Sequence, residues 1–125
     1  MAQGSVLVVD DEPNIALSLE YLMKGQGFEV RVARDGEAAL EALRERTPDV
    51  MLLDVMMPVR DGYEVCQTVR ANPAWSGVRI IMLTARGRMI EQEKGLALGA
   101  DDYITKPFST REVVERVRQY MPVAG

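Results

Sequence analysis

The chain has 125 residues, of which 47% are hydrophobic and 27% charged, and its net charge at pH 7 is −4. This size fits one domain with a complete core, so we expect a single domain over residues 1–125 and no output domain in this chain. The negative charge argues against direct binding of nucleic acid. One cysteine and no histidine exclude an internal disulfide and histidine chemistry, and the lack of a signal peptide or long apolar run predicts a cytoplasmic protein without membrane contact.

The first part of the chain predicts two strand–helix units. Ser5–Val9 is a short β-branched strand that ends in a run of three acids, and Pro13 suits the first turn of a following helix. That helix stops at Gly25, and Phe28–Ala33 then alternates apolar and polar residues as an edge strand does. Asp35 provides the cap of a second helix, whose apolar residues share one side.

The centre of the sequence is an apolar run that ends in one carboxylate. Val50–Leu53 contains no polar residue, which is typical of a strand buried on both faces of a parallel sheet, and Asp54 follows directly. Burial of an acid costs desolvation energy unless the charge has a partner or a task. The Asp61–Gly62 turn leads into a third helix, which ends at Asn72–Pro73.

The last part of the chain adds two more units. Val78–Leu83 is the fourth strand, closed by Thr84 and a polar loop, and Ile90–Leu98 is a weak helix with a thin apolar face. Asp102–Thr105 is a short fifth strand, and Ser109 caps the final helix. Because strands and helices alternate with short connections, the sequence predicts an α/β fold with a parallel sheet and helices on both faces.

In such a sheet, ligands bind at the carboxyl ends of the strands, so the residues at those ends form the candidate site. The polar residues expected there are Asp10, Asp11, Asp54, Thr84 and Lys106. Each alone has an ordinary explanation, such as a helix cap or a solvated charge, but the set at one edge is harder to explain in that way. Clustered acids raise one another's pKa values unless a cation lies among them, and hard oxygen ligands suit Mg²⁺. A carboxylate can attack phosphorus while a metal and a lysine neutralise the charge, so this set fits phosphoryl transfer.

Four segments together resemble the receiver domain of bacterial two-component response regulators. They are VLVVDDEP, LLDVMMPVRDGYEV, IIMLTA and GADDYITKPF, and they occur in the order and at the spacing typical of that family. The resemblance implies a flavodoxin-like, doubly wound (βα)5 fold with a five-stranded parallel sheet of order 2-1-3-4-5. It also implies a phosphorylation-dependent switch that promotes its own phosphotransfer and dephosphorylation but is not a metabolic enzyme.

The resemblance implies roles for the acids. Asp54 is similar to the phosphoacceptor, which receives a phosphoryl group from the phosphohistidine of a sensor histidine kinase. Asp10 and Asp11 resemble the acid pair of the family, in which Asp11 would bind Mg²⁺ directly and Asp10 through water, with Mn²⁺ as an alternative ion. Met56 would contribute its backbone carbonyl, so the implied metal ligands are Asp10, Asp11, Asp54 and Met56.

The resemblance also implies how the phosphoryl group is held and read. Thr84 and Lys106 resemble the hydroxyl and the lysine that contact the phosphoryl group. Lys106 precedes Pro107 where the family has a cis peptide bond, which would direct the lysine. Tyr103 occupies the position of the switch aromatic, which swings inward when Thr84 moves towards the phosphoryl oxygens. Arg86 is at a position that in this family affects how long the phosphate lasts.

The implied output surface comprises the fourth helix, the fifth strand and the fifth helix, where a downstream output domain or target protein would bind. In receivers attached to winged-helix DNA-binding domains, a charged set on this face pairs two receivers after phosphorylation. The corresponding residues here are Lys94, Asp101, Asp102, Arg111, Glu112 and Arg116. Ala97 stands where an acid is often found, so the homodimer contacts could be incomplete, and a solvated charged face explains the same residues equally well.

Three alternative functions are weaker. A magnesium-dependent phosphohydrolase with an aspartyl nucleophile usually carries that nucleophile after the first strand and needs a cap domain, for which no residues remain. A flavin carrier of the same topology needs a phosphate-binding loop after the first strand, where this chain has DDEP. A pseudo-receiver that acts only as an interaction module typically lacks the acceptor, the lysine or an acid, all of which are present here.

Overall fold

Five parallel strands form one sheet in the computed structural model, which describes residues 4–85 and 89–122. The strands are β1 (Ser5–Val9), β2 (Glu29–Ala33), β3 (Val50–Asp54), β4 (Arg79–Ala85) and β5 (Asp102–Lys106). Their order in the sheet is β2-β1-β3-β4-β5, and each neighbouring pair is parallel, which confirms the predicted topology.

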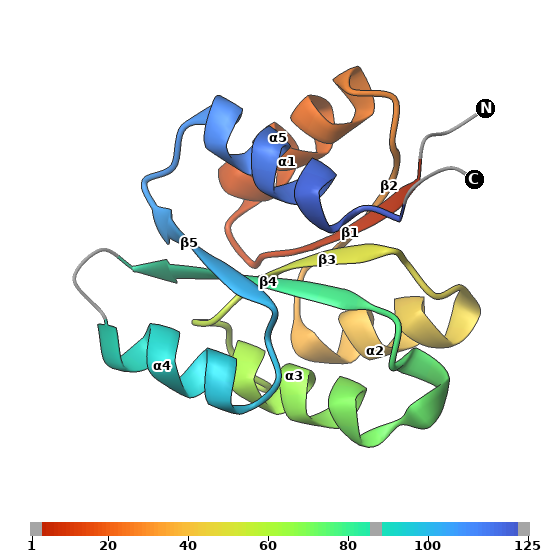
Figure 1. Cartoon of the computed structure of the whole chain (residues 1–125), viewed down its shortest axis with the longest axis vertical. Coiled ribbons are helices and arrows are strands. Elements are labelled where there is room, and N and C mark those ends of the chain that lie inside the picture. The colour runs from red at the N-terminus through yellow and green to blue at the C-terminus, as the bar shows by residue number, and fades with distance from the viewer. Residues whose placement is uncertain (1–3, 86–88, 123–125) are drawn as a thin grey trace.

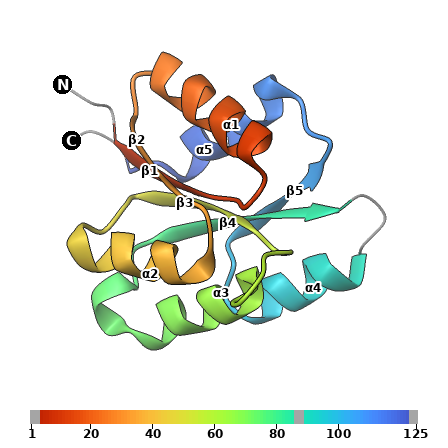
Figure 2. The same cartoon turned by 180° about the vertical axis from the view of Figure 1, so that it is seen from behind.

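Helices cover both faces of this sheet. They are α1 (Pro13–Gly25), α2 (Gly36–Glu45), α3 (Gly62–Ala71), α4 (Met89–Ala97) and α5 (Thr110–Tyr120), with a short 3-10 helix, η1 (Pro73–Trp75), between α3 and β4. Figure 1 and Figure 2 show α1 and α5 on one face and α2, α3 and α4 on the other. Within the described ranges, no helix has the length and apolar character that a bilayer-spanning segment needs.

The strands contribute to two cores because successive side chains point to opposite faces of a sheet. In β1, Leu7 and Val9 pack in the cluster that includes residues of α2 and α3, whereas Val6 and Val8 pack in the cluster that includes residues of α1 and α5. Every residue of β1 and β3 is buried, and for β3 this confirms the prediction from the unbroken apolar run Val50–Leu53. β2 lies at an edge and is mostly half-buried, which agrees with its alternating pattern.

β4 is longer at its carboxyl end than the sequence predicts. The sequence predicts a fourth strand over Val78–Leu83 that Thr84 closes, but β4 continues through Ala85. The strand continues because Thr84 and Ala85 lie in register with Thr105 and Lys106 of β5. An apolar pattern does not show this pairing, since polar side chains such as Thr84 interrupt it. The correction places Thr84 and Lys106 inside the sheet, where their backbones are fixed.

α4 is attached to the sheet through a glycine. Gly95 is its one buried residue, and a Cβ built at this position would lie 2.6 Å from Sδ of Met82 in β4. The apolar side chains at the start of the helix face solvent, with Met89 68% and Ile90 81% exposed. The thin apolar face that the sequence predicts for this helix is therefore confirmed.

Candidate functional site

Three polar side chains meet at the carboxyl ends of three strands. Asp10 follows β1 directly, Asp54 is the last residue of β3, and Lys106 is the last residue of β5. Since β1 and β3 are neighbouring parallel strands, Asp10 and Asp54 emerge at the same edge of the sheet. Both carboxylates are buried, with Asp10 0% and Asp54 4% exposed. The fold thus brings together three of the residues that the sequence predicts for the site.

The ammonium group of Lys106 lies among three carboxylates. Its Nζ is 3.1 Å from Oδ2 of Asp10, 3.3 Å from Oδ1 of Asp54 and 3.5 Å from Oε1 of Glu12. Backbone donors also hold the two aspartates: the Glu12 N–H donates to Oδ1 of Asp10 at 2.9 Å, and the Met56 N–H donates to Oδ1 of Asp54 at 3.3 Å. Each buried carboxylate is therefore both ion-paired and hydrogen-bonded, as burial of a charge requires.

The surroundings of Asp54 oppose its ionisation. Its pKa is raised from 3.8 to about 7, first by burial and then by the charge of Asp10, while Lys106 and the Met56 N–H act in the opposite direction. Burial lowers the pKa of Lys106, but the charges of Asp54 and Asp10 outweigh it, so the net pKa is raised and the ammonium form persists. Near neutral pH, Asp54 therefore lies between its acid and carboxylate forms.

Glu12, and not Asp11, completes the acidic group. Carboxylate oxygens of Asp10, Glu12 and Asp54 lie within 4.8 Å of one another. Asp11 is only partly buried and is not a member of this group, although the family resemblance implies that it binds a metal directly. In the sequence Glu12 stands out only as the third acid of a run. Its contact with Lys106, 94 positions away, depends on the fold.

A divalent cation fits this acidic group. Carboxylate oxygens are the hard ligands that Mg²⁺ and Mn²⁺ prefer, and the spacing within the group allows one ion to contact more than one of them. A cation beside Asp54 would also lower the pKa that burial and Asp10 have raised. The donor set is thus consistent with the predicted magnesium or manganese site.

Thr84 presents a buried hydroxyl beside this group. The residue is 1% exposed, and its Oγ1 has no hydrogen-bond partner among the described residues. It follows Leu83, which lies in register with Asp54. Since an unpaired buried hydroxyl costs free energy, an oxygen-rich ligand next to Asp54 would satisfy it. Of the other predicted positions, Tyr103 is partly buried against the core, and Met56 has 67% of its surface exposed.

The peptide bond between Lys106 and Pro107 is cis, as the family resemblance implies. The side chain of Lys106 reaches the acidic group from the residue directly before that bond. Arg86 lies outside the described residues.

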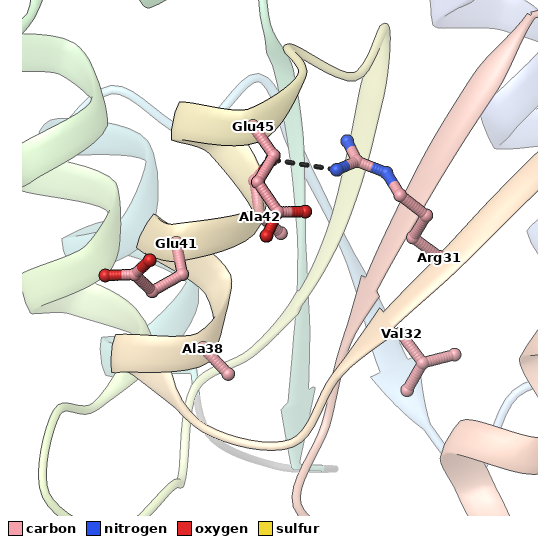
Figure 3. A pocket seen from close by; sticks show the side chains of 6 residues that line it. All are labelled: Arg31, Val32, Ala38, Glu41, Ala42 and Glu45. Carbon is pink, nitrogen blue, oxygen red and sulfur yellow. Dashed lines mark hydrogen bonds between the residues drawn. The ribbon is translucent and has the colours of Figure 1, made fainter.

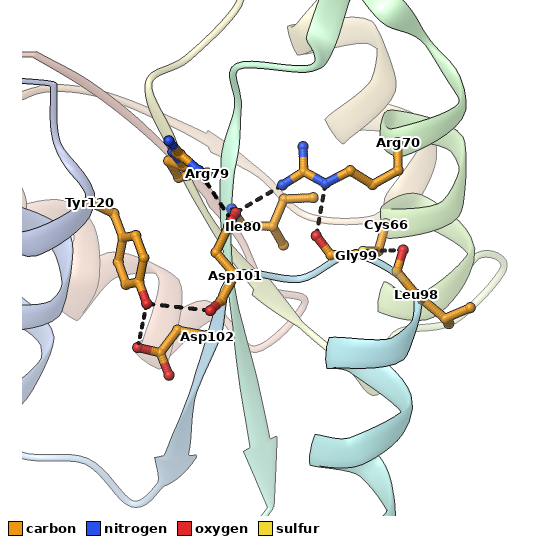
Figure 4. A network of polar contacts seen from close by, with 9 residues as sticks. All are labelled: Cys66, Arg70, Arg79, Ile80, Leu98, Gly99, Asp101, Asp102 and Tyr120. Carbon is orange, nitrogen blue, oxygen red and sulfur yellow. Dashed lines mark hydrogen bonds and ion pairs between the residues drawn. The ribbon is translucent and has the colours of Figure 1, made fainter.

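The acids predicted for a dimer face have partners within the chain. Figure 4 shows Asp101 bound to Arg70, at 2.8 Å between Oδ2 and Nη2, and Tyr120 bound to Asp102. The Asp102 carboxylate also accepts a hydrogen bond from Arg116 at 3.1 Å. These contacts join α3, the α4–β5 connection and α5 at the end of the sheet opposite the acidic group. Pairing of two chains through Asp101 and Asp102 would place the cations of a second chain beside carboxylates that already have these partners.

The cations of the same predicted face also have neighbours. The Lys94 ammonium lies 4.3 Å from the centre of the Tyr63 ring, and Arg111 pairs with Glu115 at 3.0 Å. The Glu112 N–H donates to Ser109 Oγ at 3.1 Å, which caps α5 as the sequence predicts. Within one chain these residues form local contacts on an exposed face, and their pairing with a second chain stays a prediction.

A hollow of about 570 Å³ lies apart from the acidic group, between β2 and α2. Figure 3 shows its lining residues, which are Arg31, Val32, Ala38, Glu41, Ala42 and Glu45. Nη1 of Arg31 donates to the carbonyl oxygen of Ala42 at 2.8 Å and so ties the edge strand to the helix. The hollow shares no lining residue with the acidic group and is a feature of the sheet edge.

The family model of the response regulator receiver domain matches residues 6–118, which include the whole acidic group and Lys106. A Chloroflexus aurantiacus protein described as a response regulator is 40% identical, with a TM-score of 0.91 over 94% of this chain and 97% of that one. The chemotaxis protein CheY4 of Vibrio cholerae is 31% identical, with a TM-score of 0.89 over 95% of this chain and 99% of that one. NtrX of Brucella abortus is 27% identical, with a TM-score of 0.87 over 97% of this chain but 27% of that longer chain.

Proposed function

This chain belongs to the response regulator receiver family, and we propose that it is a switch in which Asp54 accepts a phosphoryl group from the phosphohistidine of a sensor histidine kinase. The observation that carries the proposal is the position of Asp54. Its buried carboxylate ends the central strand, 3.3 Å from an ammonium group and within 4.8 Å of two other carboxylates. Phosphoryl transfer depends mainly on positioning and charge neutralisation, and this arrangement supports both.

In the proposed reaction, a carboxylate oxygen of Asp54 attacks the phosphorus atom. The new O–P bond forms as the N–P bond breaks, and the electron pair of that bond stays on the histidine nitrogen, which takes up a proton from water. Lys106 would then pair with one phosphoryl oxygen, and the unpartnered hydroxyl of Thr84 would donate to another. Because only the carboxylate form attacks, the raised pKa of Asp54 makes the metal-free reaction slow below about pH 7.

Mg²⁺ or Mn²⁺, when bound, supplies positive charge to the phosphoryl oxygens. We propose that Asp10, Asp11 and Asp54 hold the ion with the backbone carbonyl of Met56. Glu12 adds a further carboxylate to the same group, since its oxygen lies within 4.8 Å of those of Asp10 and Asp54. Asp10, Glu12 and Asp54 also pair with Lys106, so the lysine has partners to exchange when the charge of Asp54 changes.

The proposed output surface comprises α4, β5 and α5, where a downstream output domain or target protein would bind. Thr84 and Tyr103 lie on neighbouring strands, and Thr84 is in register with Thr105, two positions after Tyr103. A shift of Thr84 towards the phosphoryl group would therefore change the packing beside Tyr103. Phosphorylation-dependent homodimerisation through this face would bring a second chain against Asp102 and its partner Arg116, whose Nη1 lies 3.1 Å from Oδ1 of Asp102.

Incubation with Mg²⁺ and a small phosphodonor such as acetyl phosphate, followed by intact mass measurement, tests this proposal. We expect one base-labile phosphoryl group on the wild-type chain and none on Asp54→Asn. Asp35→Asn is a matched control, because asparagine caps a helix as well as aspartate does. Undiminished labelling of Asp54→Asn would contradict the assignment. A wild-type chain that takes no label would instead favour an interaction module that is not phosphorylated.

A further inference from the structure

The loop after β3 contains a strained turn. Among the described residues other than glycine, Val59 alone has a positive φ, of 69°. The residues on either side close a three-residue turn across it, since the Arg60 N–H donates to the carbonyl oxygen of Pro58 at 2.8 Å. A γ-turn with positive φ is rare and strained, and a β-branched residue such as valine resists that φ more than most residues.

The base of this loop is tightly fixed beside the proposed phosphoacceptor. The Gly62 N–H donates to the carbonyl oxygen of Val55 at 2.9 Å. Gly62 lies so close to β3 that a Cβ there would be 2.4 Å from the carbonyl oxygen of Asp54. The Met57 side chain is buried in the core. The side chain at the tip of the loop does not pack in the core, because Val59 is 85% exposed.

The tip is held from the side by the N-terminus of α2. Nε of Arg60 forms an ion pair with Oε1 of Glu37. Gly36 lies directly against the loop, where a Cβ would be 2.5 Å from Cβ of Arg60 and 3.0 Å from its carbonyl oxygen. At the start of α2, Gly36 therefore packs closely against Arg60, and Glu37 provides its charge partner.

We propose that Arg60 and Glu37 are positioning residues for the divalent cation site. Their ion pair holds the strained turn, and the turn fixes the direction of the Met56 carbonyl, two residues before Pro58. The Met56 N–H donates to Oδ1 of Asp54 at 3.3 Å, so movement of the loop would also disturb the nucleophile. This inference rests on the proposed function, in which Asp54 and Met56 bind the same cation.

A rival explanation is that these charges act only at long range. The side chains of Arg60 and Glu37 are 39% and 52% exposed, and an exposed ion pair contributes little to stability by itself. Through charge alone, removal of the Glu37 carboxylate would weaken cation binding and removal of the Arg60 guanidinium would strengthen it. If the pair acts through the turn, removal of either group weakens cation binding. Whether the loss of the Arg60 guanidinium lowers or raises the cation affinity therefore separates the two explanations.

Calorimetric titration of the unphosphorylated protein with Mg²⁺ measures this effect. Arg60→Gln and Glu37→Gln should each weaken binding about three-fold, the size expected for loss of an exposed ion pair. Their thermal midpoints should stay within about 3 °C of the wild type. The exchanged pair, Glu37→Arg with Arg60→Glu, should restore the affinity. Glu41→Gln is the matched control, because Glu41 pairs with Arg44 at 3.0 Å within the same helix, and its affinity should equal that of the wild type.

Each other outcome has a distinct meaning. Tighter binding by Arg60→Gln, or wild-type affinity in both single variants, would overturn the inference and leave the proposed function intact. An exchanged pair that binds no better than the single variants would also overturn it. A wild-type chain that gives no Mg²⁺ signal in the same titration would instead overturn the proposed cation site.

Discussion

Replacement of Asp54 by asparagine should stabilise the fold at alkaline pH in the absence of metal. The difference between 3.8, the ordinary pKa of an aspartate, and about 7, the pKa of Asp54 in the fold, corresponds to up to about 4 kcal/mol when the group is ionised. The asparagine amide must itself be buried, and it is a weaker partner for Lys106 than the carboxylate is. These two effects together should cost about 2 kcal/mol. The expected net gain at pH 8 is therefore about 2 kcal/mol.

The pH dependence follows from the direction of the pKa change. Because the pKa of Asp54 is higher in the folded than in the unfolded state, its contribution to stability is complete below about pH 4 and is lost as pH rises through about 7. Asparagine does not titrate in this range. The free energy of unfolding of Asp54→Asn, relative to the wild type, should therefore increase between about pH 4 and about pH 7 and then level off.

Urea unfolding in the presence of a chelator, followed by fluorescence of Trp75, the single tryptophan, provides the measurement. Millimolar Mg²⁺ should stabilise the wild type more than Asp54→Asn, because a cation lowers the pKa of the carboxylate. A gain for Asp54→Asn that is the same at pH 5 and pH 8, or a loss of stability at pH 8, would refute the reasoning.

Three further changes can be checked by thermal unfolding. Val59→Gly should stabilise the fold by about 0.5–1 kcal/mol, since relief of a strained positive φ exceeds the added unfolded-state entropy, and a lower midpoint would contradict the strain. Gly62→Ala should cost about 1–3 kcal/mol, because its Cβ would lie 2.4 Å from a backbone oxygen, whereas Gly95→Ala meets only a flexible methionine and should change stability by less than about 1 kcal/mol. Equal losses at the two glycines would refute this contrast. Asp101→Ala removes the acceptor of a buried backbone N–H and of a half-buried arginine and should cost about 2–3 kcal/mol, whereas Arg79→Ala, which is largely exposed, should be nearly neutral.

Much of the fold follows from local patterns. The unbroken apolar run of Val50–Leu53 predicts a central strand, and β3 lies in the middle of the sheet. The alternation in Phe28–Ala33 predicts an edge strand, which β2 is. The end of β4 is not predictable in this way, because Thr84 joins the strand through its register with β5 and not through its own side chain.

The candidate site is predictable to a similar extent. Asp10, Asp54 and Lys106 are found because parallel strands present their carboxyl ends at one edge. Glu12 is not found, because only the fold brings its carboxylate to 3.5 Å from Lys106. The strained turn at Val59 is also invisible in the sequence, since valine is an unfavourable residue for positive φ and no local preference predicts it there.

The glycine contact of α4 determines how this helix can separate from the rest of the molecule. Detachment of a helix costs free energy in proportion to the apolar area that it exposes, and Gly95 contributes almost none. α1, by comparison, anchors itself with Ala16, Leu19 and Met23. Backbone amides of α4 should therefore exchange with solvent deuterium through local opening, while the strands beneath exchange only in global unfolding. Separation of α4 therefore exposes little apolar surface of the helix itself, and the main apolar surface that it uncovers is that of Met82 beneath Gly95.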